Sequence, residues 1–301
     1  MSLSTDIILD RLRLKRRLLF WKIFSIILIV FIALQMSTRL NLISDTDRIA
    51  RLRIDGIILN DHNRNKKLND LIDDNSIKAL IVTINSPGGT FTGGEALFKK
   101  LRHISEKKPV VSLLEETATS AAYMVAIGGD YIISRAGTLT GSIGVILQTA
   151  NLTELMNKLG IKSEIIKSGK FKGQPNPAED FLEEARQATT LVINDLFNMF
   201  VDMIVQQRSL KRMTVLGLSD GRLYSGRMAK DLGLVDLIGT EKEAVAWLEK
   251  THKIGKNLPI FDIKPIDERG NWSKLINGIL GESFLSYGRV LGGVLSLWHP
   301  T

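Results

Sequence analysis

The stretch TINSPGGTFTGGEAL, residues 83–97, joins a strand-like segment to a helix-like segment through Asn-Ser-Pro-Gly-Gly. Glycine adopts backbone conformations that other residues avoid, and it lets peptide N–H groups converge on an anion at a strand-to-helix turn. Gly88 and Gly89 are therefore candidates for an oxyanion hole. The turn predicts one strand-to-helix unit of an α/β protein.

Strand-like and helix-like segments alternate around this turn. Short β-branched segments bounded by Gly, Pro or polar residues predict strands at 51–59, 78–84, 109–114, 130–134, 142–148 and 162–167. Helical patterns lie at 66–74, 92–106, 119–127, 151–159, 178–208, 226–233 and 241–252. The alternation predicts a parallel α/β sheet domain over residues 45–255.

The charge of the chain is concentrated near its start. The net charge is +8, and residues 11–22 hold six basic residues and no acidic one, so the remainder is only mildly basic. No basic stripe interleaved with aromatic residues is present, which argues against nucleic-acid binding. With 301 residues, 44% of them hydrophobic, the chain is long enough to bury a full core.

An apolar run follows the basic cluster. Residues 18–36 are nearly all apolar, which is about the length needed to span ~30 Å of hydrocarbon. A basic flank before such a run favours a cytoplasmic N-terminus. We expect a basic cytoplasmic segment at 1–17 and an uncleaved transmembrane anchor at 18–38. The rival interpretations are a cleavable signal peptide, for which no small-residue cleavage site follows, and a buried core helix.

Several kinds of catalytic chemistry lack the residues they need. The chain has no cysteine, which excludes thiol nucleophiles, and its four histidines stand in unrelated sequence contexts. No metal-binding, dinucleotide-binding or phosphate-loop motif occurs. We therefore expect neither a metal nor a cofactor. If the chain catalyses acyl transfer, its general base is a residue other than histidine.

Two further stretches supply a nucleophile and a base. ETATSAAYMVAIGGDYI, residues 116–132, places Ser120 at the head of an apolar helix, either as a helix cap or as a nucleophile. IIKSGKFKGQPNP, residues 165–177, delivers two lysines into a Gly/Pro-rich loop. Burial disfavours the charged form of an amine, so one of these lysines is a candidate for a neutral base.

Several motifs together resemble the signal peptide peptidase A family of bacterial serine proteases. They are NSPGG, the helix-heading serine, TLTGSIGV at 138–145, IKSGKFK at 166–172 and DGRLYSGRMAKDLGLVDLIG at 220–239. The similarity runs from about residue 50 to residue 250, and the anchor is also of the family's kind. The resemblance implies a Clp-protease/crotonase-like spiral of ββα units and a Ser/Lys endopeptidase. The roles it implies fall on Ser120 as nucleophile, Lys172 as general base, Ser142 as the hydroxyl that orients the lysine, and Gly88 and Gly89 as the oxyanion hole.

The sequence departs from the family pattern beside the nucleophile. Ala121 and Ala122 stand where many members have two glycines. Each replacement exchanges one small residue for another, so we expect the site to tolerate it with tighter backbone packing. Lys170, two residues before the implied base, is expected to be its exposed neighbour.

The location and the resemblance together suggest the substrate. A site near the outer face of the membrane, lined by Leu113, Met124 and Ile143, suits apolar peptides, and the resemblance implies released signal peptides. It also implies a homo-oligomer, such as an octamer. Residues 256–301 are expected to be a peripheral extension, with an amphipathic helix within 272–298 that contacts the membrane or a neighbouring subunit.

Three other functions stay open at this point. The first is a protease of the same family that acts on membrane proteins or stress-related proteins. The second is a crotonase-type acyl-CoA enzyme, because that fold also uses glycine oxyanion holes, although it gives no reason for the serine, the lysine or the anchor. The third is a catalytically silent scaffold.

Overall fold

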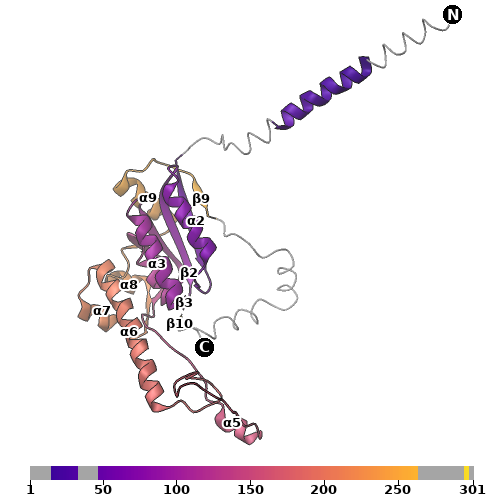
Figure 1. Ribbon diagram of the computed structural model, residues 1–301. Coiled ribbons are helices and arrows are strands. Elements are labelled where there is room, and N and C mark those ends of the chain that lie inside the picture. Colours follow the sequence, from indigo (N-terminus) through magenta and orange to yellow (C-terminus); the bar gives the residue numbers. More distant parts are fainter. Residues whose placement is uncertain (1–14, 33–46, 264–294, 298–301) are drawn as a thin grey trace, which may run out of the picture. The chain divides into compact units, whose positions relative to one another are not determined.

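The computed structural model describes residues 15–32 and 47–263, together with the backbone of 295–297. The chain divides into two units, Met1–Thr46 and Asp47–Thr301. In the first unit, residues 15–32 form a helix whose side chains are all exposed (Figure 1). The predicted anchor over 18–38 begins within this helix, and its last residues, 33–38, lie outside the described residues.

An eight-stranded sheet forms the centre of the second unit as far as the structure describes it. Its order is β7-β6-β4-β2-β1-β9, with β5 paired to β4 and β8 paired to β5. Every pairing is parallel except β6 with β7. This confirms the expected mixed α/β fold with a central sheet. The strands are β1 Arg48–Asp55, β2 Ile77–Ser86, β4 Val110–Thr119, β5 Tyr131–Ser134, β6 Leu139–Gly141, β7 Leu223–Ser225, β8 Leu237–Ile238 and β9 Ile260–Asp262.

Strand β4 is shared between two neighbours on one of its edges. Its residues 111–114 pair with β5, whereas residues 117–119 pair with β6. The other edge pairs with β2, with an irregularity between Ile84 and Ser86. Because β4 reaches past β5 to β6, its last residues lie where β2, β4 and β6 end together.

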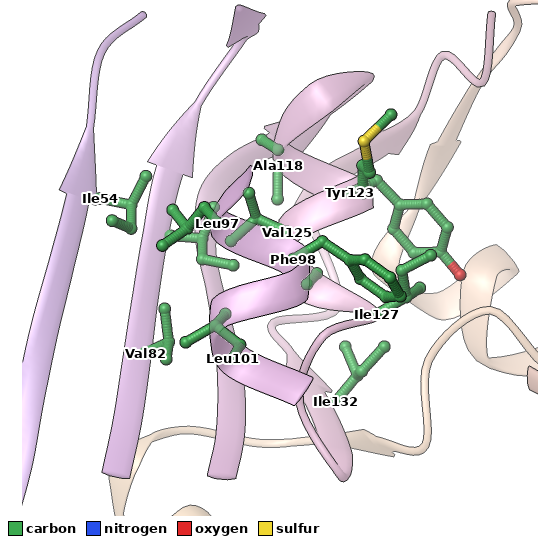
Figure 2. Close-up of a cluster of buried hydrophobic side chains, with 14 of the residues drawn as sticks. Ile54, Val82, Leu97, Phe98, Leu101, Ala118, Tyr123, Val125, Ile127 and Ile132 are labelled. Atoms are coloured by element: carbon green, nitrogen blue, oxygen red, sulfur yellow. The ribbon is translucent and has the colours of Figure 1, made fainter. Parts of the chain in front are cut away.

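Helices cover both faces of this sheet, and each face has its own apolar cluster. On β2, Leu80, Val82 and Ile84 belong to the larger cluster, whereas Ala79 and Ile81 belong to the smaller one beneath α9. Figure 2 shows Leu97 and Leu101 of α3 lying between that helix and the strands. Burial of each such side chain stabilises the fold by roughly 1.5–3 kcal/mol. Because both faces of the sheet are covered, its central strands are continuous apolar sequences. The helices are α2 His62–Asp73, α3 Phe91–Ser105, α4 Ala121–Ala126, α5 Thr153–Lys158, α6 Glu183–Arg208, α7 Arg212–Leu218, α8 Gly226–Asp231 and α9 Glu241–His252.

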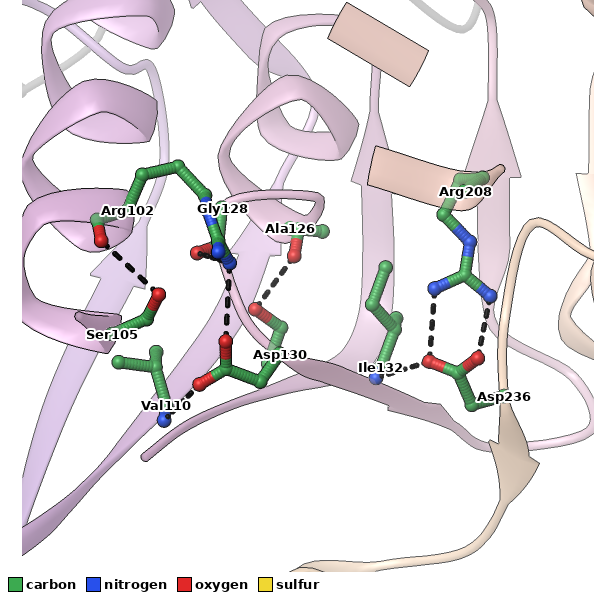
Figure 3. Close-up of polar contacts among 10 residues, drawn as sticks. Arg102, Ser105, Val110, Ala126, Gly128, Asp130, Ile132, Arg208 and Asp236 are labelled. Carbon is green, nitrogen blue, oxygen red and sulfur yellow. Dashed lines mark hydrogen bonds and ion pairs between the residues drawn. The ribbon is translucent and has the colours of Figure 1, made fainter. Parts of the chain in front are cut away.

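Two aspartates of the recognised motifs have structural roles. Asp236 receives two hydrogen bonds from Arg208 at 2.9 and 2.6 Å and one from the Ile132 N–H at 2.8 Å (Figure 3). Asp130 accepts from the Val110 N–H at 2.9 Å and from Arg102 at 3.1 Å. The first cluster ties the end of α6 to β5, and the second ties α3 to the start of β4.

The chain between β6 and α6 extends away from the sheet as an arm, residues 143–182, that carries α5 (Figure 1). The strands expected at 142–148 and 162–167 do not form there. Ile143 and Val145 are buried in the core, whereas Ile165 and Ile166 are exposed, and among the described residues no strand pairs with either segment. The outer half of α6 shares this exposure, with Leu191 and Val192 more than half exposed.

Helix α6 is the one described helix with the length and apolarity of a membrane span. Its inner half is part of the protein core, because Phe200, Val201 and Ile204 are fully buried in the larger cluster. The packing of these three residues identifies that half as a core helix.

The C-terminal region differs from the expected peripheral extension over 256–301. Strand β9, Ile260–Asp262, pairs in parallel with β1, so the sheet continues past the expected boundary at residue 255. Strand β10, Leu295–Leu297, pairs antiparallel with β3, Gly88–Thr90. The amphipathic helix expected within 272–298 is therefore wrong at 295–297, where backbone pairing imposes an extended conformation, and residues 272–294 lie outside the described residues.

Candidate active site

Ser120 lies at the sharp turn between β4 and α4. Its backbone has φ 58° and ψ −121°, a conformation that side-chain-bearing residues rarely adopt. The peptide group is held on both sides, because its N–H donates to the Gly141 carbonyl at 2.8 Å and its carbonyl accepts from the Met124 N–H at 3.0 Å. Although Ser120 occupies the N-cap position, its side chain makes no capping hydrogen bond. The geometry therefore does not support the helix-cap interpretation.

The glycines of NSPGG form β3 beside this turn. The Gly88 N–H donates to the Ser86 hydroxyl at 3.1 Å, and the same hydroxyl donates to the Gly88 carbonyl at 3.2 Å. On one edge of β3, the Ile58 N–H donates to the Gly88 carbonyl at 2.8 Å and the Thr90 N–H donates to the Ile58 carbonyl at 2.9 Å. Since peptide groups alternate along a strand, the Gly89 N–H points toward the opposite edge.

These contacts distinguish the two candidate oxyanion donors. The N–H of Gly88 is engaged by Ser86, so the better candidate is the N–H of Gly89. A Cβ atom on Gly89 would lie 1.9 Å from the Ile58 carbonyl oxygen, and only glycine fits this close approach. The roles of Ser86 and Ile58 do not follow from the sequence, because a serine before Pro-Gly-Gly and a lone isoleucine carry no separate signal.

Ser142 follows the next strand at the same end of the sheet. It has φ 47°, is nearly buried, and donates its N–H to the Arg222 carbonyl at 2.8 Å. Its predecessor Gly141 accepts the hydrogen bond from Ser120 and pairs with Thr119. Ser86 pairs with Ala118 two residues before Ser120. The carboxyl ends of β2, β4 and β6 thus bring the serine, the glycines and Ser142 to one edge, where ligands of parallel sheets commonly bind.

Helix α3 leaves room for the two alanines that stand beside Ser120 in place of the family's glycines. Ala121 and Ala122 are both fully buried in α4. A Cβ atom on Gly94 would lie 3.1 Å from the Ala121 methyl group, so α3 approaches α4 at a point where α3 has no side chain. The tighter packing expected from the sequence is possible because Gly94 leaves this space.

The structure places Lys172 apart from these groups. Lys172 is exposed on the arm, in a turn where its N–H donates to the Gly169 carbonyl at 3.0 Å. Among the described residues, no hydrogen bond joins its side chain to Ser120 or Ser142. Lys170 pairs with Glu184 at 3.1 Å, also on the surface. One copy of the described chain therefore assembles the candidate nucleophile and oxyanion donors without the candidate base.

The three residues expected to line a substrate pocket do not share one surface. Met124, four residues after Ser120, and Ile143, directly after Ser142, are fully buried in the larger apolar cluster. Leu113 belongs to the smaller cluster with Leu248 of α9, on the other face of the sheet. The reason is alternation along β4, which turns Leu113 away from the face that carries α4.

Exposed apolar residues line an open groove at the base of the arm. Its volume is about 600 Å³, and it lies between residues 146–149 and the outer half of α6. Further exposed apolar side chains continue along the arm, namely Leu152, Leu155, Leu159, Ile161, Ile165, Ile166 and Phe171. The described residues hold no cluster of His, Asp or Glu suited to a metal ion.

A serine in a strained strand-to-helix turn, beside a glycine strand whose Gly89 peptide group faces away from Ile58, is an arrangement suited to acyl transfer. The family model of Peptidase family S49 matches residues 102–255, about half of the chain. The chain therefore belongs to peptidase family S49, which agrees with the family resemblance in the sequence.

Several proteins named as proteases or peptidases are similar in sequence to much of the chain. A candidate protease from Methanocaldococcus jannaschii is 38% identical over 61% of this chain and 59% of its own length. A candidate protease from Synechocystis sp. is 35% identical over 68% of this chain and 74% of its own length. A candidate signal peptide peptidase from Enterococcus faecium is 29% identical over 69% and 64%. The matched part thus spans about three fifths to three quarters of these relatives.

One solved structure shares a distant likeness with the chain. It is a mutant of a membrane-bound stomatin-specific protease, with a TM-score of 0.49 and 13% sequence identity. The similarity covers 73% of this chain and 99% of that one.

Proposed function

We propose that the protein is a membrane-anchored serine endopeptidase with a Ser/Lys dyad that degrades released signal peptides and other apolar peptide segments. The single observation that carries the proposal is the position of Ser120, which is held in a strained turn at the carboxyl ends of β4 and β6, beside the glycine strand β3. Membership in peptidase family S49 supports the same reaction class.

The proposed reaction begins when the Ser120 hydroxyl attacks the scissile carbonyl carbon. The hydroxyl proton passes to the Lys172 amine, and the Gly89 N–H donates to the oxyanion that forms. The protonated lysine then gives its proton to the leaving amine, which departs and leaves an acyl-enzyme. A water molecule then attacks the ester carbonyl carbon and gives its proton to the same lysine. The bond to the Ser120 oxygen breaks, the protonated lysine returns its proton to that oxygen, and the acyl product leaves as a carboxylic acid.

The base must reach the serine in a dry environment. A lysine in water has a pKa of about 10.4 and is protonated at neutral pH, so it cannot accept the serine proton. Lys172 is exposed in the single chain and lies on an arm with many exposed apolar residues. We propose that the arm packs against a second copy of the chain and buries Lys172 near that copy's Ser120. The homo-oligomer, such as an octamer, then completes the site.

The N-terminal helix is the part of the chain proposed to attach the enzyme to the membrane. Residues 15–32 are helical and exposed, and the apolar run at 18–36 overlaps the end of the basic cluster at 11–22. We propose that this helix is part of a single membrane span with the N-terminus in the cytoplasm and the protease domain outside. An active site near the outer membrane surface would meet signal peptides as they leave their preproteins.

A serine-reactive phosphonate probe tests the proposal directly. The wild-type chain is expected to be labelled at Ser120, and Ser120→Ala is expected to abolish both labelling and hydrolysis of an apolar fluorogenic peptide. Lys172→Ala should fall to the same floor, whereas Lys170→Ala should keep most of the activity. Labelling that survives Ser120→Ala, or none in the wild type, would favour an acyl-CoA enzyme or a silent scaffold.

A further inference from the structure

One peptide group connects the candidate nucleophile to strand β7. It joins Gly141 to Ser142 and is called the bridging peptide below. Its carbonyl, that of Gly141, accepts from the Ser120 N–H at 2.8 Å, and its N–H, that of Ser142, donates to the Arg222 carbonyl at 2.8 Å. The C=O and N–H of a trans peptide group point in opposite directions, so the bridging peptide lies between Ser120 and β7. Its orientation therefore affects the backbone of Ser120 and of Ser142 together.

The ring of Tyr224 lies against the bridging peptide. Tyr224 belongs to β7, is 3% exposed and pairs with Thr140, the residue before Gly141. A Cβ atom on Gly141 would lie 2.5 Å from the Tyr224 Cδ2 atom and 3.0 Å from the Arg222 carbonyl oxygen. Gly141 also has φ 84°, which glycine adopts without a steric cost. The ring thus contacts the backbone directly and leaves the bridging peptide little room to rotate.

Groups outside the proposed reaction hold Tyr224 and its neighbour in place. The Tyr224 hydroxyl donates to the Leu218 carbonyl at 3.1 Å, at the end of α7. The Asp220 carboxylate accepts from the Arg222 N–H at 3.1 Å and from the Arg222 guanidinium at 2.8 Å. Tyr224 is also packed in the larger apolar cluster, where close packing restricts the motion of a ring. The ring is therefore a rigid support for the bridging peptide.

We propose that Tyr224 is a positioning residue of the candidate active site, which holds the bridging peptide and through it directs Ser120 and Ser142. Both serines have positive φ, and such conformations persist only where the surrounding structure holds them. The effect on catalysis rests on the proposed function. The restraint on the Ser120 backbone does not require catalysis, so it can be measured separately.

Replacement of the ring tests the positioning role by kinetics. Tyr224→Leu gives the bridging peptide room to move. Because a displacement of about 1 Å can cost on the order of 10²-fold in rate, we expect kcat on an apolar fluorogenic peptide to fall about tenfold, with KM nearly unchanged. Tyr224→Phe keeps the ring and loses only the hydrogen bond to Leu218, so its kcat should stay close to that of wild type. Tyr224→Met fills the space with a flexible chain and should lower kcat as Tyr224→Leu does, which provides a second variant if Tyr224→Leu does not fold.

Phe98→Leu is the matched control for loss of stability. Phe98 is 7% exposed in the same apolar cluster. A Cβ atom on Gly128, which follows the C-terminal end of α4, would lie 3.2 Å from the Phe98 carbonyl oxygen, whereas Ser120 stands at the N-terminal end of α4. Tyr224→Leu and Phe98→Leu should both lower the melting temperature, but Phe98→Leu should keep its kcat. An equal loss of kcat in the two variants would overturn the proposal, because Tyr224 would then act only through stability.

Hydrogen exchange reports the Ser120 backbone without catalysis. Mass spectrometry that resolves single amides should show faster exchange of the Ser120 N–H in Tyr224→Leu than in wild type, Tyr224→Phe or Phe98→Leu, because its hydrogen bond to Gly141 opens more often. Equal exchange at this amide in all four proteins would also overturn the proposal. If wild type hydrolyses no peptide while the difference in exchange is present, the proposed function fails and the positioning role stands.

Discussion

Ser120 shows how local strain can be maintained at a functional position. A backbone with positive φ at a residue other than glycine costs on the order of 1–3 kcal/mol, and it persists only where the surroundings hold it. Here the Gly141 carbonyl and the Met124 N–H fix both sides of the residue. Ser142, with φ 47°, repeats the pattern at the end of β6. Strain at two adjacent strand ends is consistent with the proposed site.

The positioning of Gly88 and Gly89 by Ser86 leads to a prediction about catalysis. Ser86→Ala removes the two hydrogen bonds between the Ser86 hydroxyl and Gly88 and leaves the one from the Ile58 N–H, so the neighbouring Gly89 N–H should be less firmly fixed in direction. Removal of an oxyanion donor costs on the order of 10²–10³ in kcat, and a loosened donor should cost about tenfold. Steady-state kinetics on an apolar peptide should show this fall in kcat with a nearly unchanged KM.

Ser112→Ala is the matched control for Ser86→Ala. Its hydroxyl is equally buried and donates to the Ala126 carbonyl at 2.8 Å, on the same sheet. Each substitution should cost about 1 kcal/mol of stability. An equal loss of kcat in both variants would show that Ser86 acts only through general stability.

The sequence predicted part of the candidate site because motifs mark residue types. Ser120, Gly89 and Ser142 follow strand ends in recognisable contexts, and the structure brings them to one edge. A motif does not say which of two glycine N–H groups is already engaged, since that depends on the Ser86 hydroxyl and on Ile58. The face of the sheet on which Leu113 lies also cannot be predicted from the sequence. Strand β4 is buried on both faces, so apolar and polar residues do not alternate along it.

At the scale of elements, apolar pattern and strand pairing are separate properties. The segments at 78–84 and 109–114 became strands β2 and β4 because each has a partner on both edges. The segment at 142–148 has a similar composition but no partner in the described chain. Strand β3 was missed for the opposite reason, because three residues with two glycines give no strand signal and pairing alone defines it.

The turn from α2 into β2 should depend on acidic pH. The Asp74 carboxylate accepts from the Ser76 hydroxyl at 2.6 Å, from the Ser76 N–H at 2.9 Å and from Arg48 at 3.0 Å. The Ser76 hydroxyl, followed by its N–H and Arg48, holds the pKa of Asp74 below its ordinary value despite partial burial. A lowered pKa means that this stabilisation is complete above the unfolded-state pKa of about 3.9 and is lost as pH falls through the folded-state pKa.

Thermal unfolding as a function of pH measures this contribution. Asp74→Asn should lower the melting temperature at pH 7 by more than it does at pH 2, because the stabilisation by the wild-type carboxylate decreases as the pH falls below the unfolded-state pKa toward the folded-state pKa. Asp73→Asn is the control, because the neighbouring carboxylate makes none of these hydrogen bonds. A constant difference between wild type and Asp74→Asn from pH 7 to pH 2 would contradict the prediction.

The attachment of α6 to the sheet rests on a partly buried ion pair. The Arg208 side chain is 11% exposed and that of Asp236 is 25% exposed. Removal of one partner leaves the other charge unpaired, so Asp236→Ala and Arg208→Ala should each cost about 3–5 kcal/mol. Chemical denaturation of the double variant should show a loss clearly smaller than the sum of the two single losses. Additive losses would mean that the two side chains act independently.

At the scale of the whole molecule, the exposed apolar residues of the arm are the feature that the sequence could not resolve. Composition predicts that such residues are buried, but it does not say whether the cover comes from the same chain or from another. Large exposed apolar patches on a folded chain mark interaction surfaces. The arm carries both this surface and Lys172, which ties the proposed assembly to the completion of the proposed site.

Mixed oligomers test whether the dyad forms between copies. Ser120→Ala and Lys172→Ala should each be inactive alone, yet co-expression with two affinity tags should yield mixed assemblies that hydrolyse the apolar peptide. With random mixing, about a quarter of the sites pair an intact serine with a neighbour's intact lysine, so activity should return to about a quarter of wild type. Ser120→Ala mixed with the double variant is the control, because no serine remains and activity should stay at the floor. If the first mixture also stays at the floor while both tags copurify, the arm must instead bring Lys172 to Ser120 of its own chain.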